Sequence, residues 1–381
     1  MGDETFLDGL RVLDLSRVLA GPLAGQILAD LGAEVLKVEP PQGDDTRRWG
    51  PPFQGPLAAY FTSCNRGKAS LVLDLRDETA RTRLARLVAS ADVVLHNFLP
   101  PTARRLGLDA ERLGREQPRL VALGISGYSG SRRDEPGYDL ALQAETGWIG
   151  MTGPEAEGYK AGVAVVDVLT GMMAANGVQA ALLRRARTGA GAVLGLSLYR
   201  TAMFSLVNVA ANHLVSGAPT RRWGNRHPNL VPYQAFAAAD RQLVMGVGND
   251  AQFGRLCDLL GLADAGLRAL DNAGRLARRD AVVGAVAAAV ARWPAAELVE
   301  ALRRQRIPAA LLRMPEEALA EVVRWDPGAL LAVAHPVAGT LRQVALPLEA
   351  DGLAATHSPP PLLGEGGEEL AARWLAGPSV G

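Results

Sequence analysis

The sequence predicts an α/β protein whose larger domain is a Rossmann-like, mostly parallel sheet covered by helices. Between residues 10 and 125, short apolar segments alternate with segments of helical spacing, which is typical of a parallel sheet. The short segments are continuous apolar runs, as expected of strands buried on both faces. A polar stretch with proline and glycine at 221–232 ends this pattern, and a smaller α/β or α+β unit follows it.

The elements of the larger domain follow in chain order. Leu10 to Leu15 is an apolar strand, and Leu23, Ile27 and Leu31 then share one face of a helix over 21–31. Further strands are predicted over 34–38, 70–73, 93–95 and 120–125, with helices over 78–88 and 101–106. Two long helices are predicted over 172–187 and 197–216, joined by residues 188–191.

The smaller unit and the end of the chain contain fewer elements. Strands are predicted over 234–236 and 242–247, and helices over 251–260, 275–291 and 295–304. A strand over 339–344 follows, and a proline-rich segment from Ser358 leads into a short helix.

Composition limits the classes of partner. The chain of 381 residues carries 40 basic and 40 acidic side chains, so no net charge draws it to nucleic acid or to an anionic membrane. Its two cysteines, Cys64 and Cys257, lie far apart, which favours a reducing compartment. The opening Met1–Thr5 is acidic where a signal peptide is basic, and apolar runs such as 142–152 and 281–291 are too short or interrupted to span a bilayer. We expect a cytoplasmic protein without a nucleic-acid or membrane partner.

One carboxylate, Asp167, lies in a run of small and apolar residues from Gly162 to Gly171. Aspartate is a preferred helix N-cap, which is the structural interpretation. Removing a carboxylate from water costs several kcal/mol, however, and a desolvated carboxylate is a better nucleophile, which is the functional interpretation.

No histidine pair has metal-ligand spacing, and no Gly-x-Ser-x-Gly motif is present. We therefore expect no metal.

Several segments together resemble the class III coenzyme A transferases, the family of formyl-CoA transferase and carnitine CoA-transferase. The resemblance covers essentially the whole chain. The turn at His96-Asn97-Phe98 stands where the family has a Glu-Asn-Phe type of turn. The other matching segments are 7–16, Ala20-Gly21-Pro22, 31–40, 43–47, 61–75, Gly137-Tyr138-Asp139 with Gln143 and Gly147, Asp167 with Thr170-Gly171, 363–365 and 368–370.

The resemblance implies that Asp167 is the covalent catalyst. Its carboxylate would attack an acyl-CoA thioester to form a mixed anhydride, and the retained CoA thiolate would convert this into an aspartyl-CoA thioester. An acceptor acid would then take the CoA by the reverse steps. Such chemistry needs no ATP and no tightly bound cofactor, since coenzyme A and acyl-CoA are substrates, but it needs water to be excluded.

The same match assigns candidate binding residues. Backbone amides at Val18 and Ala20 can approach the ligand, and Asn97 and Phe98 can bond and cover it. Lys37 and either Arg104 or Arg105 could meet the CoA phosphates, although solvated surface charge is the alternative for each. The expected CoA-contacting residues are Val18, Ala20, Lys37, Asn97, Phe98, Arg104, Arg105 and Tyr138. The expected lid over the substrate is formed by Gly246, Gly248 and Asn249. The alternative interpretation of this segment is a strand-to-helix turn capped by Asn249.

Two other activities remain open. An α-methylacyl-CoA racemase of the same fold carries Gly-His-Asp where this chain has Gly137-Tyr138-Asp139, and a tyrosine is a poor base near neutral pH, so a transferase is favoured. A catalytically silent CoA-binding protein is the other alternative. Substrate identity is undetermined, but a dicarboxylate would need an arginine such as Arg47 or Arg226.

The resemblance also implies a domain arrangement and an assembly. Residues 1–200 would form the CoA-binding domain, 201–225 a linker helix, 226–325 the small domain, and 326–381 a segment that returns to the large domain. Two ring-like chains would interlock as a homodimer.

Overall fold

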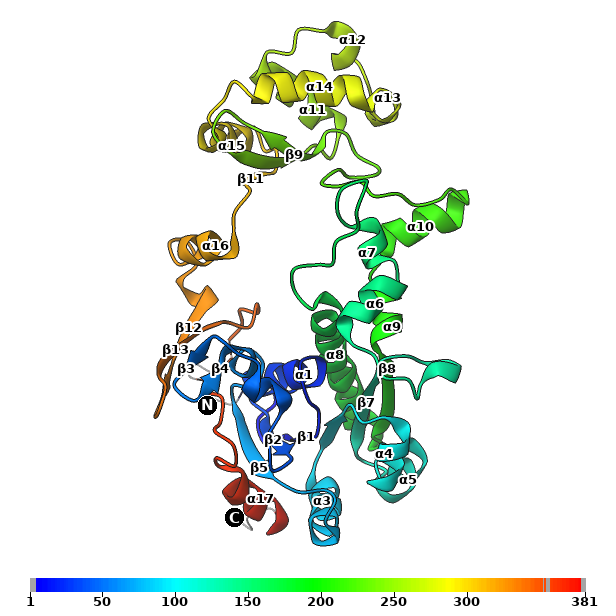
Figure 1. Ribbon diagram of the computed structural model, residues 1–381, viewed down its shortest axis with the longest axis vertical. Coiled ribbons are helices and arrows are strands. Elements are labelled where there is room, and N and C mark those ends of the chain that lie inside the picture. Colours follow the sequence, from blue (N-terminus) through cyan, green and yellow to red (C-terminus); the bar gives the residue numbers. More distant parts are fainter. Residues whose placement is uncertain (1–4, 352, 354–356, 378–381) are drawn as a thin grey trace. The chain divides into compact units, whose positions relative to one another are not determined.

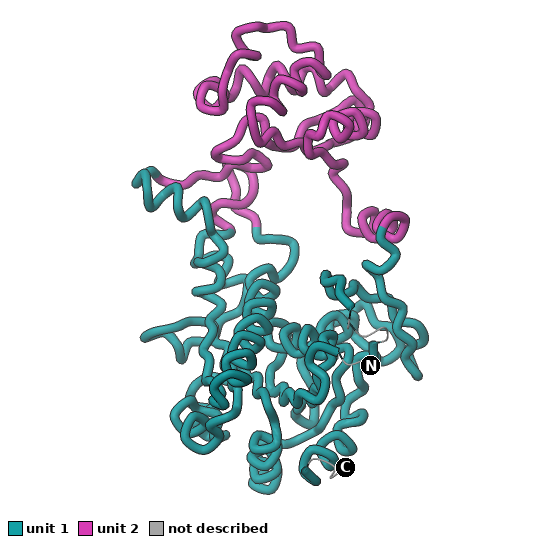
Figure 2. Tube along the Cα trace, turned by 180° about the vertical axis from the view of Figure 1, so that it is seen from behind, with its two compact units in different colours: residues 1–148, 160–218, 326–381 teal, residues 149–159, 219–325 magenta. Residues whose placement is uncertain are grey.

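The computed structural model describes residues 5–351, 353 and 357–377. Two compact units make up the chain (Figure 2). Unit 1 combines residues 1–148, 160–218 and 326–381, and unit 2 combines residues 149–159 and 219–325. The smaller unit therefore starts at Pro219 instead of the expected 226, and it takes in a short segment, 149–159, that the sequence pattern places in the larger domain.

Unit 1 is built on a six-stranded parallel sheet, which confirms the predicted fold class (Figure 1). The strand order is β5-β2-β1-β6-β7-β8, so the chain moves outward on one side of β1 and then returns to pair β6 on the other side. This reversal creates a topological switch point beyond the carboxyl ends of β1 and β6. The strands are β1 (Arg11–Asp14), β2 (Glu34–Glu39), β5 (Lys68–Val72), β6 (Val93–His96), β7 (Val121–Ser126) and β8 (Ala192–Ser197).

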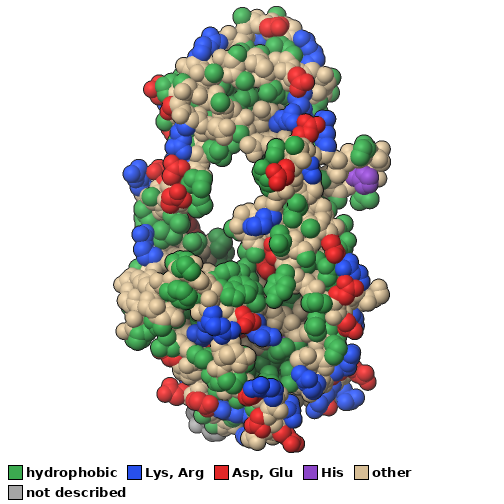
Figure 3. Space-filling view, viewed as in Figure 1, with side chains coloured by type: hydrophobic (Ala, Val, Ile, Leu, Met, Phe, Trp, Pro, Cys, Tyr) green, Lys and Arg blue, Asp and Glu red, His purple; other side chains and the backbone are tan. Residues whose placement is uncertain are grey.

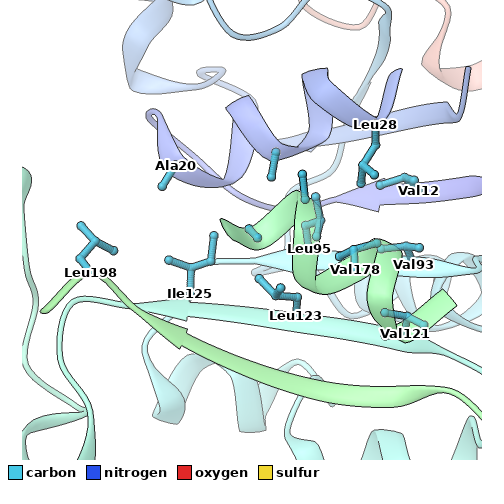
Figure 4. Close-up of a cluster of buried hydrophobic side chains, with 14 of the residues drawn as sticks. Val12, Ala20, Leu28, Val93, Leu95, Val121, Leu123, Ile125, Val178 and Leu198 are labelled. Carbon is cyan, nitrogen blue, oxygen red and sulfur yellow. The ribbon is translucent and has the colours of Figure 1, made fainter. Parts of the chain in front are cut away.

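Helices cover both faces of this sheet. Successive strand residues point to opposite faces, so Val12 belongs to one hydrophobic core and Leu13 to the other. Figure 4 shows Val12, Leu28, Val93 and Val178 gathered in the first core, between helices and sheet. The first core includes α1 (Ala20–Asp30), α6 (Asp139–Glu145), α8 (Val165–Thr188) and α9 (Leu198–Phe204), and the second includes α3 (Glu78–Ser90), α4 (Pro100–Arg105), α5 (Ala110–Glu116) and α17 (Gly367–Leu375).

The end of the chain packs on the sheet of unit 1. The backbone N–H of Ser70 in β5 donates to the carbonyl of Glu365, and that of Gly364 donates to the Ser70 hydroxyl. Trp374 in α17 is 1% exposed, and its indole N–H donates to Glu34. In Figure 1, α17 accordingly lies near α3 and β5. Both ends of the chain thus build one unit.

Unit 2 contains a three-stranded antiparallel sheet with a core of its own. Its order is β11-β10-β9. The elements are β9 (Tyr233–Ala237), β10 (Gln242–Gly246), β11 (Ala309–Leu311), α11 (Asp250–Leu260), α12 (Ala265–Arg268), α13 (Asn272–Ala277), α14 (Arg279–Val290), α15 (Ala295–Arg304) and α16 (Pro315–Val322).

Smaller elements complete the chain. They are η1 (Asp45–Arg48), β3 (Phe53–Gln54), β4 (Leu57–Ala58), α2 (Ala59–Thr62), η2 (Gly130–Arg132), α7 (Trp148–Met151), α10 (Val207–Ser216), η3 (Pro327–Ala329), β12 (Leu330–His335) and β13 (Gly339–Val344). Over the visible face of the sheet-bearing unit, Lys and Arg side chains are interspersed with Asp and Glu (Figure 3). This distribution matches the balanced composition.

Several expectations about the secondary structure were wrong or incomplete. Helix α8 begins at Val165, seven residues before the predicted start, because Asp139 of another helix accepts hydrogen bonds from its first N–H groups. Strand β8 was missed, since this glycine-containing edge strand gains its conformation by pairing with β7. The predicted helix over 197–216 is interrupted between α9 and α10, where Val207 has a φ of 40°, and no helix continues over 217–225. The helix over 275–291 is likewise two helices, α13 and α14, and β12 was not predicted.

Helix α8 also corrects the expectation about apolar runs. Its 24 residues include a window of mean hydropathy 1.3, so by length and composition it could cross a membrane. Its buried face consists of small and β-branched residues that pack on α1 and the sheet. A core helix of a globular unit meets the same criteria, so the window is weak evidence for a span.

Close packing of α8 on α1 depends on Gly171. A Cβ atom at this position would lie 2.7 Å from the carbonyl oxygen of Ala20 and 3.1 Å from Leu23. By contrast, a Cβ atom at Gly177, six residues further along α8, would make only ordinary contacts, the shortest of them 3.7 Å to Leu194.

We predict that Gly171→Ala destabilises the protein by about 1–3 kcal/mol, because backbone atoms must move to accept the methyl group. The matched control, Gly177→Ala, should be neutral or stabilise by up to about 1 kcal/mol, since alanine is the better helix former. Urea denaturation of both variants measures this difference. Equal effects would show that the α1–α8 contact does not require glycine.

Candidate active site

Asp167 lies in the first turn of α8 and is half-buried. The N-cap position belongs to Ala164, whose side chain makes no capping hydrogen bond. Asp167 is therefore the third residue of the helix, three positions after the N-cap. The structural interpretation of this residue as an N-cap is wrong. Its side chain forms no ion pair within the part of the chain that the structure describes.

The cap of α8 is supplied by Asp139 from α6. The Asp139 carboxylate accepts hydrogen bonds from the backbone N–H of Val166 at 2.8 Å and of Asp167 at 3.3 Å. Gln143, one turn further along α6, donates to the other Asp139 oxygen and accepts from the N–H of Ala161 at 2.8 Å. Asp139 is 8% exposed and Gln143 is fully buried, so this pair fixes where α8 begins.

Burial, and after it the nearby negative charge of Asp139, raises the pKa of Asp167 to about 7. The same environment acts on Tyr60 in α2. Burial, followed by the charge of Asp167, raises the pKa of Tyr60 to about 12, so this hydroxyl stays protonated. Tyr60 packs edge-on against Trp49 with ring centroids 5.1 Å apart. Neither Tyr60 nor Trp49 was predicted as a site residue, because only the folded chain brings Tyr60 close to Asp167 and Trp49 against Tyr60.

The loop after β1 combines strain with an open helix end. Val18 has a φ of 72°, which costs about 1–3 kcal/mol in a β-branched residue. Its N–H points to the Asp44 carboxylate at 3.3 Å, so it is not the free amide that the sequence suggested. Ala20 begins α1, and no side chain caps this first turn. Since Gly171 of α8 packs against Ala20, this helix end lies one turn from Asp167 along α8.

A buried network of charges holds these loops. Lys68 donates to Asp14 at 2.9 Å, and Lys37 pairs with Asp44 at 3.0 Å and donates to the Ser16 carbonyl. Burial alone would lower the pKa of Lys37, but the surrounding carboxylates outweigh it and raise this pKa. Lys37 is fully buried and its ammonium group is satisfied, so the structure contradicts its expected contact with CoA phosphates.

The network continues through Arg47, whose guanidinium binds Glu39 with two hydrogen bonds of 2.6 and 2.8 Å. It also donates to the carbonyl of Pro361 and lies 3.7 Å from the Phe61 ring. Arg47 thus ties the C-terminal segment to the loop after β2. With its charge already paired, it is not the free arginine that a dicarboxylate would need.

At the switch point, a cleft of about 760 Å³ lies beyond the ends of β1, β2 and β6. Asn97 bridges the two central loops, because its amide accepts from the N–H of Arg17 at 3.1 Å and donates to the Arg17 carbonyl at 2.9 Å. Its amide therefore positions the cleft wall and is not free for a ligand. Phe98 and Arg105 line the same cleft. Arg17, Arg76 and Arg81, which were not predicted, line it too.

Comparison with known proteins identifies the family. A model described as CoA-transferase family III matches residues 7–366. The chain belongs to CoA-transferase family III. It is 40% identical over 327 residues to a succinate–glutarate CoA-transferase of Agrobacterium fabrum, a match covering 83% of this chain and 82% of that one. It is 37% identical over 308 residues to an acetyl-CoA:oxalate CoA-transferase of Acetobacter aceti, covering 79% of each chain.

A solved structure agrees with this assignment. A CAIB/BAIF family protein from Brucella suis superposes with a TM-score of 0.83 at 37% identity, covering 97% of this chain and 100% of that one. The family III enzyme is thus a CoA transferase that uses CoA thioesters as substrates. The racemase and the silent CoA-binding protein are the alternatives that this membership disfavours.

The remaining predicted residues lie apart from the switch-point cleft. Arg104 lines a second cavity of about 630 Å³ in unit 1, which runs along β7 and β8. Tyr138 is the N-cap residue of α6 and is 67% exposed, so it adjoins the capping Asp139 without being enclosed by a pocket. No group of three or more His, Cys, Asp or Glu side chains that could hold a metal occurs within residues 5–351, 353 and 357–377.

The expected lid is a strand-to-helix turn of unit 2. Gly246 ends β10, and Asn249 is the N-cap of α11, accepting from the N–H of Gln252 at 2.9 Å. Gly248 donates its N–H to the Gln252 side chain at 2.8 Å. Neither glycine has a positive φ. The turn therefore has the local geometry of the alternative interpretation, a capped helix start.

We predict that Asp167→Asn stabilises the family III enzyme at alkaline pH. Because the folded-state pKa of about 7 lies above the ordinary 3.8, the contribution of Asp167 is fully present below about pH 4 and is lost as pH rises through 7. Asparagine does not ionise, so the variant should gain about 1–4 kcal/mol over the wild type at pH 8. Urea denaturation at pH 4.5 and pH 8 measures the gain, and an equal difference at both pH values would contradict it.

Proposed function

We propose that this family III enzyme moves CoA between an acyl-CoA and a small dicarboxylic acid, with Asp167 as the covalent catalyst. One observation carries the proposal: a half-buried carboxylate with a pKa of about 7, at a helix start that Asp139 caps. Burial leaves this carboxylate poorly solvated, which favours nucleophilic attack, and shelters an anhydride from water.

The proposed steps balance without a further reactant. An Asp167 oxygen attacks the thioester carbonyl, the C–S bond breaks, and the CoA thiolate leaves a mixed anhydride. The thiolate then attacks the aspartyl carbonyl carbon, which releases the donor acid as a carboxylate and forms an aspartyl-CoA thioester. The acceptor carboxylate attacks that thioester, and the released thiolate attacks the acceptor acyl carbon. The products are a new acyl-CoA and free Asp167.

Several residues of unit 1 support these steps. The uncapped first turn of α1 offers amide N–H groups for a developing oxyanion. Tyr60 stays protonated near Asp167, so its hydroxyl is a second candidate donor. Asp139 has no free role as a base, because its oxygens accept the N–H groups of α8 and the Gln143 amide. It is a positioning residue.

The switch-point cleft is the proposed CoA site. Arg17 and Arg105 can meet phosphates there, and Phe98 can cover an apolar part of the ligand. The substrate class comes from relatives named for succinate, glutarate and oxalate. Since Arg47 is paired with Glu39, another group must hold the second carboxylate of such a substrate.

We also propose that the enzyme is a homodimer, as the resemblance implies. Helix α10 has no buried residue, and it exposes Leu214 by 81% and Val215 by 89%. Phe204 at the end of α9 is 76% exposed. Apolar side chains exposed in such a group are typical of a surface that another protein covers.

We predict that Asp167→Ala lowers the rate of CoA transfer from succinyl-CoA to glutarate by about 10³-fold or more, because the nucleophile is lost. Chromatographic assay of glutaryl-CoA measures it. Hydroxylamine added with succinyl-CoA should trap a modified Asp167 in the wild type, detectable by mass spectrometry. The control Asp77→Ala removes an exposed cap of α3 and should keep its transfer rate. Normal turnover of Asp167→Ala, or solvent deuterium exchange at the substrate α-carbon without CoA transfer, would refute the mechanism.

We predict that Leu214→Glu with Val215→Glu converts the dimer to monomers, since two charges would be buried in the contact. Light scattering after size-exclusion chromatography measures the mass. As a control, Val337→Glu on the β12–β13 hairpin also places a charge at an exposed apolar position, and it should leave the dimer intact. A monomeric wild type would contradict the assembly.

A further inference from the structure

Unit 2 contains a pocket whose charge is not balanced. The pocket has a volume of about 460 Å³ and lies between the segment at 221–226 and the start of α14. Two acidic residues, Glu155 and Asp280, lie among the residues that line it. The arginines that line it are Arg221, Arg222, Arg226, Arg278 and Arg279, here called the arginine pocket.

Backbone carbonyls orient three of these guanidinium groups. A carbonyl oxygen accepts a hydrogen bond without carrying a full negative charge, so the arginines are fixed in place but remain cationic. Arg222 donates to the carbonyl of Glu155 at 2.8 Å, Arg226 to that of Trp223 at 3.1 Å, and Arg279 to those of His227 at 3.1 Å and Pro228 at 2.9 Å.

Other arginines of unit 2 do have carboxylate partners. Arg275 pairs with Asp250 at 2.8 Å, and Arg241 with Glu317 at 3.2 Å. In the described part of the chain, none of the five pocket arginines lies within ion-pair distance of a carboxylate. Their mutual repulsion is therefore only partly offset, by the charge of Asp280.

Two further observations favour an anion in this pocket. The Nε atom of Arg222 is buried and has no hydrogen-bond partner, which is costly for a charged group. Burial, and after it the positive charges of Arg226 and Arg221, lower the pKa of Arg279. An anion in the pocket would offset the positive charges that lower this pKa.

The start of α14 adds to the positive potential. Its N-cap residue is Arg278, and no side chain caps the first turn. The free N–H groups and the helix dipole therefore favour an anion there, although Asp280 in the same turn offsets part of the effect.

We propose that the arginine pocket of unit 2 binds a phosphate-type polyanion. Guanidinium groups bind phosphate oxygens in pairs, and a pyrophosphate or a nucleotide phosphate offers several oxygens and two or more charges within a few ångströms. The anion could be free pyrophosphate or the phosphates of a nucleotide such as CoA. This proposal does not depend on the chemistry of Asp167.

Titration of the full-length protein with inorganic pyrophosphate at low salt tests the proposal. The Trp223 ring lies 4.0 Å from the Arg221 guanidinium and 4.8 Å from that of Arg279, so tryptophan fluorescence reports on the pocket, and calorimetry gives the affinity. Arg221→Gln with Arg278→Gln should weaken binding by about tenfold or more, because two of five charges are lost. Neither residue is held by a backbone carbonyl, so the fold should persist.

The control Arg292→Gln with Arg304→Gln makes the same charge change at exposed positions of unit 2 and should keep the affinity. Repeating the titrations with CoA and with CoA lacking the 3′-phosphate separates the sources. If the pocket variant loses affinity for both pyrophosphate and CoA, the anion is that of the nucleotide, whereas a loss for pyrophosphate with an unchanged CoA affinity identifies a free anion. The proposal would be overturned if the pocket variant and the control variant bound pyrophosphate with equal affinity. It would also be overturned if the wild type bound succinate as tightly as pyrophosphate. A change of oligomeric mass without a change of affinity would also overturn it.

Discussion

The capping of α8 by Asp139 is the interaction on which the site depends. A helix start leaves its first N–H groups without intrahelical partners, and here a carboxylate from α6 accepts two of them. This contact determines that α8 begins at Val165, which places Asp167 in the first turn. The same carboxylate adds a negative charge beside Asp167 and helps to raise its pKa. Asp139 therefore fixes the position of the candidate nucleophile and, after burial, contributes to its raised pKa.

Beneath this site, charged side chains are buried in matched sets. The pairs Lys68–Asp14 and Lys37–Asp44 are inaccessible to solvent, the pair Arg47–Glu39 is largely buried, and together they hold the loops after β1 and β2. Breaking one partner of a buried pair leaves an uncompensated charge, so such loops resist deformation. A rigid loop can hold the strained backbone of Val18 and keep the start of α1 uncapped. The arginine pocket of unit 2 differs in this respect, because its like charges are oriented without carboxylate partners.

Much of the fold was predictable because its signals are local. The strands β1, β2, β6 and β7 are short apolar runs, and α1, α3 and α15 have an apolar face at helical spacing, so their approximate bounds were predicted. The errors occurred where the deciding contact is distant in sequence. Strand β8 needs β7 as its partner, and the start of α8 needs Asp139, which precedes it by 26 residues. Tyr60 and Trp49 were missed for the same reason.

The sequence by itself determined the parallel α/β sheet, the candidate nucleophile Asp167 and, through resemblance, the CoA-transferase family. These depend on residue order and local spacing, which a single chain displays directly. Only the tertiary structure decided which charged residues are free. Lys37, Arg47 and Asn97 looked available in the sequence, but folding brings each next to a partner that occupies it. Five arginines from separate segments meet in one pocket for the same reason, since through-space distance, and not sequence distance, governs electrostatic interaction.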